Sequence, residues 1–472
     1  MRRAVPAVAA GLLLAGPTVL AFRSGGYYAE PRVIAGIVAW LLVLALALTG
    51  PAPLPRSAPG RAALGGLVLL CAWSALSVTW APLRGPAQES AQRLVLYTGA
   101  LVVAVGALPV ALRAVEPALA AGATIVIGYG LSGRLLPGLI ELDRSRSAGG
   151  RLEQPITYWN AEGALAAVGL VLCARLIGDR SRPPWMRAAA AAATAPLGAG
   201  VYLSYSRGAI AVAVLGLVML VAALPERAQL RASAIVFAAG AAASIAAAAF
   251  PGVAALEGTD PERDGAAVLV LLALIAAAAA LVTAQPAPDG ALRPPRRLAP
   301  ALVAAFAAGL VVAGLAERPS NAELAAGAGA TRLTTVSSNR YEYWRVGADA
   351  FAREPLTGIG AGGFRVEWLR ERPLPEAVRD AHSLEVEVAA ELGLPGLIAL
   401  ALLAGGITAA GLGALRRRRT LAAGPAVALL AWFLHASIDW DWQLPAVTLP
   451  AIALAGALMV LADEGAGLSD PR

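Results

Sequence analysis

Residues 265–284, GAAVLVLLALIAAAAALVTA, are twenty consecutive residues without a single charge. A helix that crosses the hydrocarbon core of a bilayer needs about 20 mostly apolar residues. This pattern predicts an all-α polytopic bundle of about 12–14 transmembrane helices. Apolar stretches of the same kind recur near residues 4–22, 32–49, 61–80, 92–111, 114–132, 160–176, 187–204, 208–224, 231–250, 299–316, 384–413, 421–438 and 443–463.

The composition supports the same fold class. Of the 472 residues, 58% are hydrophobic and 15% are charged, against roughly 25% charged residues in soluble domains. A soluble fold cannot bury so much apolar surface, so membrane lipids are the expected surroundings and no nucleic-acid partner is expected despite the net charge of +7. Cys71 and Cys173 lie in apolar runs and predict neither a disulfide nor a metal site. The apolar stretch after Met1 is interpreted as a retained first span.

Arginine distribution predicts the orientation, because basic residues concentrate in cytoplasmic loops. The run Arg416–Arg419 is the strongest such signal. If it is cytoplasmic, alternation of the spans puts the other arginine-rich linkers and both termini on the same side. We therefore expect a multi-pass protein of the cytoplasmic (inner) membrane whose long polar segment 317–383 faces outward. The linkers concerned contain Arg2 and Arg3, Arg56 and Arg61, Arg175, Arg180, Arg182 and Arg187, and Arg293, Arg296 and Arg297.

Three regions follow from this topology. Residues 1–316 are expected to hold about 11 spans, and residues 384–472 about three more and a short cytoplasmic tail. Residues 317–383 are expected to form an extracytoplasmic loop domain with amphipathic helices.

Inside that loop domain we expect a flexible stretch over 317–336, and then a helix capped by Ser338 or Asn339. Its apolar positions are Tyr341, Trp344, Ala348 and Phe351, at helical spacing. A glycine-rich turn over 358–363 is expected to end this helix, and a second helix is expected to begin near Asp380.

Three polar features converge on the outer boundary of the predicted bundle. Arg207, in Tyr205-Ser206-Arg207-Gly208, is costly beside a bilayer unless it is partnered, although alone it also fits a snorkelling anchor. Arg340 and Arg345 flank the aromatic residues of segment 339–345, which suits binding of phosphate and sugar and equally suits a solvated surface helix. His382 can act as a base near neutral pH or simply begin a helix.

Taken together, these segments resemble the O-antigen ligase/polymerase family. The resemblance rests on Asn339-Arg340 and Trp344, then EPLTGIGAGGF over 354–364, Ala381-His382-Ser383, and ELGLPG over 391–396. Ser206-Arg207-Gly208 resembles the family's arginine motif at the membrane boundary. The clear similarity covers roughly residues 200–400, and the ordered combination is more specific than any single motif.

The resemblance implies an inverting, metal-independent glycosyltransferase without a cofactor. Such an enzyme moves a glycan from undecaprenyl-diphosphate to an acceptor hydroxyl at the outer leaflet, where the acceptor is a glycan, a lipid or a protein. By position, Arg207 and Arg340 would hold the diphosphate and His382 would serve as the family's histidine. Ser383 stands where the family often has Asn, which puts the side-chain network around His382 in doubt. Ligase, polymerase and oligosaccharyltransferase reactions all remain open.

Further residues are candidates for substrate binding. Tyr341, Trp344 and Arg345 accompany Arg340, while Asn160 and Glu162 follow the aromatic pair Tyr158-Trp159 where an outer loop re-enters the membrane. His435 and Asp439 lie on the predicted outer side, although an interfacial aromatic belt also explains Asp439-Trp440-Asp441-Trp442. We expect no metal there.

The rival hypothesis from another class is a transporter or flippase for a lipid-linked or small polar substrate. It requires polar groups near the bilayer midplane, interrupted helices and an inverted repeat. Polar candidates gathered at the outer rim favour transfer chemistry instead.

Overall fold

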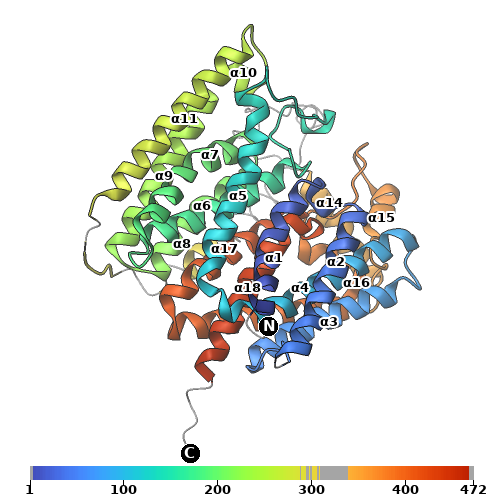
Figure 1. Cartoon of the computed structure of the whole chain (residues 1–472). Helices are drawn as coiled ribbons and strands as arrows, with labels where there is room; N and C mark the ends of the chain where they lie inside the picture. Colours follow the sequence, from blue (N-terminus) through green and yellow to red (C-terminus); the bar gives the residue numbers. More distant parts are fainter. Residues whose placement is uncertain are drawn as a thin grey trace, which may run out of the picture.

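The computed structural model describes residues 4–50, 52–286, 289–293, 297, 300–305, 308 and 339–466. This part of the chain is an all-α bundle (Figure 1). Its long helices are α1 (Ala4–Ala21), α2 (Ala29–Thr49), α3 (Ala58–Ser77), α4 (Arg84–Ala107), α5 (Leu112–Leu135), α6 (Trp159–Gly178), α7 (Pro184–Leu203), α8 (Arg207–Ala223), α9 (Arg227–Ala248), α11 (Pro261–Ala284), α16 (Leu384–Arg417), α17 (Arg419–Ala436) and α18 (Pro445–Ala466). The shorter elements are α10 (Pro251–Ala254), α14 (Arg340–Arg353), α15 (Phe364–Glu371) and the 3-10 turns η1 (Ser24–Gly26), η2 (Leu108–Val110), η3 (Arg146–Ala148) and η5 (Asp441–Gln443).

Eleven of the described helices are long and apolar enough to cross a membrane. Together with α7 and the shorter apolar α8, they correspond to every predicted stretch except 299–316, most of which lies outside the described residues. The predicted polytopic helical bundle is therefore confirmed, and the chain is a multi-pass membrane protein. The predicted flexible stretch 317–336 and the predicted cap Ser338 also lie outside the described residues.

Helices α6, α17 and α18 form the centre of the bundle, between α9 and α11 on one side and α2, α3 and α16 on the other (Figure 1). Small residues allow the helix backbones to approach closely. A Cβ atom added at Gly66 of α3 would lie 2.5 Å from the backbone nitrogen of Leu403 in α16. One added at Gly198 of α7 would lie 2.4 Å from the Cα of Gly240 in α9. Because these helices touch through glycine, larger side chains at those positions would separate them.

The two ends of the bundle differ in chemistry. One end, called here the arginine end, holds the Arg416–Arg419 run and a buried ion pair in which Arg182 Nη2 lies 2.9 Å from Glu116 Oε2. The other end, called here the loop end, is tied together by contacts between distant segments. The rings of Tyr27 and Trp440 lie 5.7 Å apart there. The loop end carries residues 22–28, 136–158, 204–206, 339–383 and 437–444.

Helix α14 confirms the predicted helix after Asn339, but its most buried residues are not the predicted apolar ones, of which Trp344 packs at the edge of the buried cluster. Its buried residues are Tyr343, Val346, Gly347 and Ala350, one or two positions away from the predicted Tyr341, Trp344, Ala348 and Phe351. Tyr343 packs with Phe364 and Trp368 of α15, a helix that the sequence pattern did not predict. Asn339 precedes α14 without capping it and instead donates to Glu376 Oε2 at 2.8 Å.

The segment that follows α14 is fixed by a break in α16. Gly393 has φ 61° and ψ −157° inside that helix, a conformation open mainly to glycine. The break exposes backbone groups, so that Ile359 N–H donates to Ala390 O at 3.0 Å and Leu394 N–H donates to Pro355 O at 2.8 Å. The predicted glycine-rich turn therefore lies after the end of α14 at Arg353 and docks onto α16, which begins at Leu384 and not near Asp380.

Candidate active site

A single buried carboxylate connects three segments at the loop end. Asp439, between α17 and α18, is fully buried. Tyr158 Oη donates to its Oδ1 at 2.6 Å, and Asn160 Nδ2 donates to its Oδ2 at 2.8 Å. Both partners stand at the start of α6, where Tyr158 is the residue before the helix. Asp439 therefore ties the α17–α18 connection to the start of α6.

Arg340 completes this network from the third segment. Its Nη2 donates to Asp439 Oδ2, and 22% of its side chain remains exposed. Burial opposes the charge on Arg340, but Asp439 together with Tyr158 raises the pKa of the guanidinium above its usual value. Burial likewise opposes the charge on Asp439, but Arg340 and His382 lower the pKa of that carboxyl below its usual value. Both partners are thus charged at neutral pH, and Arg340 is held in place without being sealed from the surface.

His435 and Asp441 form a second hydrogen-bonded pair, which positions the residues on either side of Arg207. His435, at the end of α17, shares a 2.5 Å hydrogen bond between its Nδ1 and Asp441 Oδ2, and its Nε2 lies 3.4 Å from Ser206 Oγ. Ser206 caps α8 by accepting from Ala209 N–H at 3.2 Å. Arg207 is therefore the first residue of a helix whose start is held against His435.

Glycine at position 208 allows this close approach. A Cβ atom there would lie 2.9 Å from Ile438 Cδ1 and 3.3 Å from the ring of His435. In the Ser-Arg-Gly motif, Ser206 thus caps the helix, Arg207 supplies the positive charge, and Gly208 allows the close contact with α17.

His382 stands on a strained turn just before α16. Its φ is 53°, which is uncommon for a residue other than glycine and costs energy. The turn is held by Trp344 Nε1, which donates to the carbonyl oxygen of His382 at 3.4 Å, and by ring contacts with Tyr343 (5.1 Å) and Trp440 (6.5 Å). Strain supported by so many neighbours is typical of a functional position.

The hydrogen bond of His382 identifies its tautomer. Nδ1 lies 2.9 Å from Asp380 O. A carbonyl oxygen only accepts, so Nδ1 carries the hydrogen, and in the neutral ring Nε2 is the acceptor. Burial lowers the pKa of His382 below its usual value. The ring is therefore neutral at pH 7 and presents Nε2 as a base.

Glu391 clamps the glycine-rich segment that positions α14 and α15. Its Oε2 accepts from Gly362 N–H at 2.7 Å and its Oε1 from Phe364 N–H at 3.1 Å. Ser77 of α3 helps by accepting from Ala361 N–H at 3.1 Å. The ELGLPG motif thus supplies both the clamp and, through Gly393, the helix break.

We expect Glu391→Ala to destabilise the loop end, because two buried N–H groups lose their acceptor at about 1–3 kcal/mol each. The measurement is the melting temperature of the purified protein. Glu371→Ala, at an exposed position of α15, is the control and should melt like the wild type. Equal melting of Glu391→Ala and wild type would contradict the role of the clamp.

The structure separates the predicted substrate-binding residues into two groups. Asn160, His435 and Asp439 join the network around Arg340 and Arg207. Trp344 supports the backbone of His382, and Tyr341 is half-buried on α14. Two residues point elsewhere. Arg345 is exposed and pairs with Glu342 and Asp349 on its own helix. Glu162 is fully buried and accepts from Ile156 N–H at 3.0 Å.

The sequence did not predict that Tyr158, Ser206 and Asp441 hold their neighbours in the site in place. The structure gives the two carboxylates different partners, Arg340 for Asp439 and His435 for Asp441. Over the described residues, no cluster of three or more His, Cys, Asp or Glu side chains is arranged to hold a metal ion.

Comparison with known proteins adds one finding. Residues 262–401 match the family model described as O-antigen ligase. The matched region runs from α11 to the middle of α16 and contains Arg340, His382 and Glu391. Asp439, which pairs with Arg340, and Ser206, which lies against His435, stand outside the matched region. No curated protein matches the chain.

Proposed function

Because the match over 262–401 supports membership of the O-antigen ligase/polymerase family, we propose that this membrane enzyme is a lipid-linked-glycan transferase. It would take a glycan from undecaprenyl-diphosphate and pass it to an acceptor hydroxyl, with inversion and without a metal. The observation that carries the proposal is the placement of a partly exposed Arg340 and a neutral His382 at one end of the bundle.

The geometry suits a single displacement. The acceptor oxygen attacks the anomeric carbon and forms the new glycosidic bond. The bond from that carbon to the diphosphate oxygen breaks, and the electron pair leaves with the diphosphate. Arg340 and Arg207 stabilise the growing negative charge. The acceptor proton passes to Nε2 of His382.

An apolar cavity beside the site suits a part of the lipid chain of such a donor. It has a volume of about 390 Å³ and lies between α8, α16, α17 and α18. Leu384 and Trp442 line it at the loop end, next to Ser383 and Asp441, and Leu415 and Ala223 line it toward the arginine end. A polyprenyl chain in this cavity would leave its diphosphate near Arg207 and Arg340.

We propose that the loop end faces the extracytoplasmic side. Basic residues favour the cytoplasmic side of a membrane, and the Arg416–Arg419 run lies at the opposite end from His382. A diphosphate lipid already carries an activated leaving group, so transfer at the outer face needs no nucleotide sugar.

The distribution of charge favours transfer over the rival transport function. The charged residues of the described spans gather toward the helix ends, and Arg93 in α4 is the one that lies farthest in. A transporter places its substrate groups near the midplane. The polar groups described above instead converge at the loop end.

We expect transfer to slow as the pH falls through the pKa of His382. Only the neutral ring accepts a proton, and burial lowers its pKa below the usual 6.5. The rate should therefore stay level around pH 7 and fall about tenfold per pH unit below that pKa. The measurement is the pH–rate profile of the purified enzyme. Persistence of the same acid limb in His382→Gln would contradict the assignment.

The function is tested by complementing a strain that lacks the gene. Wild type, Arg207→Ala, Arg340→Ala and His382→Ala are compared, with the exposed Arg345→Ala as a matched control. Surface glycan and undecaprenyl-linked precursor are measured, and the membrane level of each variant is checked. The proposal expects the first three variants to reach the membrane, lose surface glycan and accumulate precursor, while Arg345→Ala complements. Normal complementation by all of them would overturn it.

A further inference from the structure

A row of aromatic rings leads from the edge of the bundle to His382. The ring centroids of Tyr28 and Tyr27 lie 5.6 Å apart, and those of Tyr27 and Trp440 lie 5.7 Å apart. The centroid of Trp440 lies 6.5 Å from that of His382. Tyr27 and Tyr28 belong to the α1–α2 connection, and Trp440 belongs to the α17–α18 connection. Opposite ends of the chain therefore build these three residues, called here the aromatic row, which reaches the candidate base.

The aromatic row is accessible from the surface. Tyr28 is 63% exposed, and Tyr27, Trp440 and His382 are half-buried. Tyr27 and Trp440 also pack against the hydrophobic core. Each residue of the row is thus supported by the bundle while part of its surface remains free to meet a ligand.

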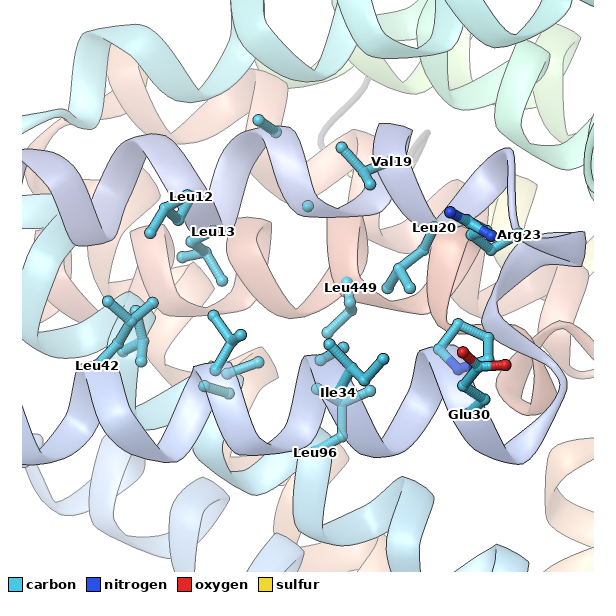
Figure 2. A pocket seen from close by; sticks show the side chains of 18 of the residues that line it. Leu12, Leu13, Val19, Leu20, Arg23, Glu30, Ile34, Leu42, Leu96 and Leu449 are labelled. Carbon is cyan, nitrogen blue, oxygen red and sulfur yellow. The ribbon is translucent and has the colours of Figure 1, made fainter.

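The outer end of the row lies at the rim of an apolar groove between α1 and α2. The groove has a volume of about 690 Å³, and Tyr28 lines it. Figure 2 shows two other lining residues, Arg23 and Glu30, at the end of the groove beside the α1–α2 connection. Tyr28 therefore borders open space and not a neighbouring helix.

The inner end of the row is Trp440, which is held in place beside the candidate site. Its ring centroid lies 4.2 Å from that of Tyr158, and its backbone N–H donates to Asp439 Oδ1 at 2.9 Å. Within the described residues, the indole N–H of Trp440 is neither buried nor hydrogen-bonded. Trp440 therefore offers both a ring and an unused donor next to His382.

An interfacial aromatic belt does not account for the whole row. Such a belt follows the perimeter of a membrane protein at the level of the lipid headgroups, and Tyr28 fits that description. Trp440 instead connects α17 and α18, which lie at the centre of the bundle (Figure 1). A row that runs from the perimeter to the centre, and ends at a histidine, indicates a ligand.

The chemistry of the row suits a sugar chain. A sugar ring carries C–H groups on its faces, which are attracted to the electron-rich face of an aromatic ring and lose contact with water there. Its hydroxyl groups need hydrogen-bond partners. The indole N–H of Trp440 can donate to them, and so can Arg379, an exposed residue whose Nη1 donates to Tyr27 Oη at 3.2 Å.

We propose that the aromatic row binds the sugar rings of the acceptor, with the sugar that carries the attacking hydroxyl on Trp440. This inference rests on the proposed function and narrows the acceptor to a glycan. Trp440 contacts His382, which takes the acceptor proton. The cavity proposed for the donor lipid is lined by Trp442 and by none of the three residues of the row. The acceptor chain therefore extends from His382 toward the α1–α2 edge.

The first test measures binding without transfer. The probe is the oligosaccharide mixture released by partial acid hydrolysis of the surface polysaccharide of the source strain. Native mass spectrometry detects its binding to the purified full chain in non-ionic detergent. Trp440→Leu should bind about tenfold more weakly than the wild type, and Trp440→Phe, which keeps an aromatic ring, within about threefold. Trp185→Leu, the same change at an exposed tryptophan at the arginine end, should bind normally.

A second variant does not depend on packing around Trp440. Tyr28 is the residue before α2, a position that serine suits as a helix cap, so Tyr28→Ser should keep the fold. It should bind the oligosaccharides about threefold more weakly, whereas Tyr28→Phe should bind like the wild type. In the transfer reaction, Trp440→Leu should raise the KM for the acceptor about tenfold and leave the KM for the donor unchanged.

Equal oligosaccharide binding by the wild type and Trp440→Leu would overturn the proposal, as would absence of binding by the wild type. So would an equal loss in Trp440→Phe together with normal binding by Tyr28→Ser, because packing would then explain the effect. A rise in the KM for the donor instead of the acceptor would assign the row to the donor glycan. If the row binds oligosaccharides but the wild type transfers nothing, the proposed function fails and the glycan-binding site stands.

Discussion

Replacing Arg340 by alanine should lower glycan transfer about 100-fold or more, the scale of losing one preorganised group that stabilises developing negative charge. Because 22% of its side chain is exposed, Arg340 can be reached by a diphosphate, and its ion pair with Asp439 fixes its position. The measurement is the initial rate of transfer by purified variants at saturating donor. Arg345→Ala, on the same helix with only exposed ion pairs, should change the rate less than about twofold.

Arg340→Ala also leaves the Asp439 carboxylate buried without its cation, which costs about 3–5 kcal/mol. A second variant separates this loss of stability from the loss of chemistry. In Arg340→Ala/Asp439→Asn the uncompensated charge is gone, so the melting temperature should recover while transfer stays low. Recovery of transfer together with stability would show that Arg340 only holds the fold.

Replacing His382 by asparagine should lower transfer about 10²–10⁴-fold, the usual contribution of a general base. Asparagine is chosen because it tolerates positive φ better than alanine does, and its side-chain NH₂ can donate to Asp380 O as Nδ1 does. The folded turn is thereby kept while the base at Nε2 is removed. The measurement is kcat and KM, and we expect kcat to fall with KM nearly unchanged.

The control for His382→Asn is Trp344→Phe, which removes one hydrogen bond to the carbonyl oxygen of His382 and retains an aromatic, though smaller, side chain. It should reduce the rate only a few-fold. Transfer by His382→Asn at the wild-type rate would show that His382 is not the base.

The fold was predictable because its cause is local. Each apolar stretch must satisfy its own backbone in a bilayer, and a helix does so within the segment. Residues 265–284 were therefore recognisable as a helix without reference to any other part of the chain. Which face of α14 is buried could not be predicted, because that face is determined by its contact with Phe364 and Trp368 of α15. Tyr343 is buried in that contact, whereas Trp344 packs only at its edge and Tyr341 is not part of it.

The arginines and the histidine of the candidate site could be proposed from the sequence, but the contacts that position them could not. Arg207, Arg340 and His382 stand out because charged groups are scarce at a membrane boundary. The pairing of Arg340 with Asp439 joins residues 99 positions apart, and no local pattern encodes it. Glu162 is a residue whose local pattern suggested a different role from the contact it makes. Its polar side chain at a helix start suggested sugar binding, but the loop before α6 uses it to accept from Ile156 N–H.

We propose above that the loop end breaks the bond between a glycan and its lipid diphosphate. The most direct measurement is the undecaprenyl diphosphate released, by mass spectrometry, when purified protein in lipid vesicles receives an undecaprenyl-diphosphate-linked glycan and acceptor. The wild type should release the diphosphate lipid in step with glycan transfer, whereas His382→Asn should bind the donor and release almost none. Equal release by both proteins, or movement of the intact donor across the membrane without release, would contradict the account.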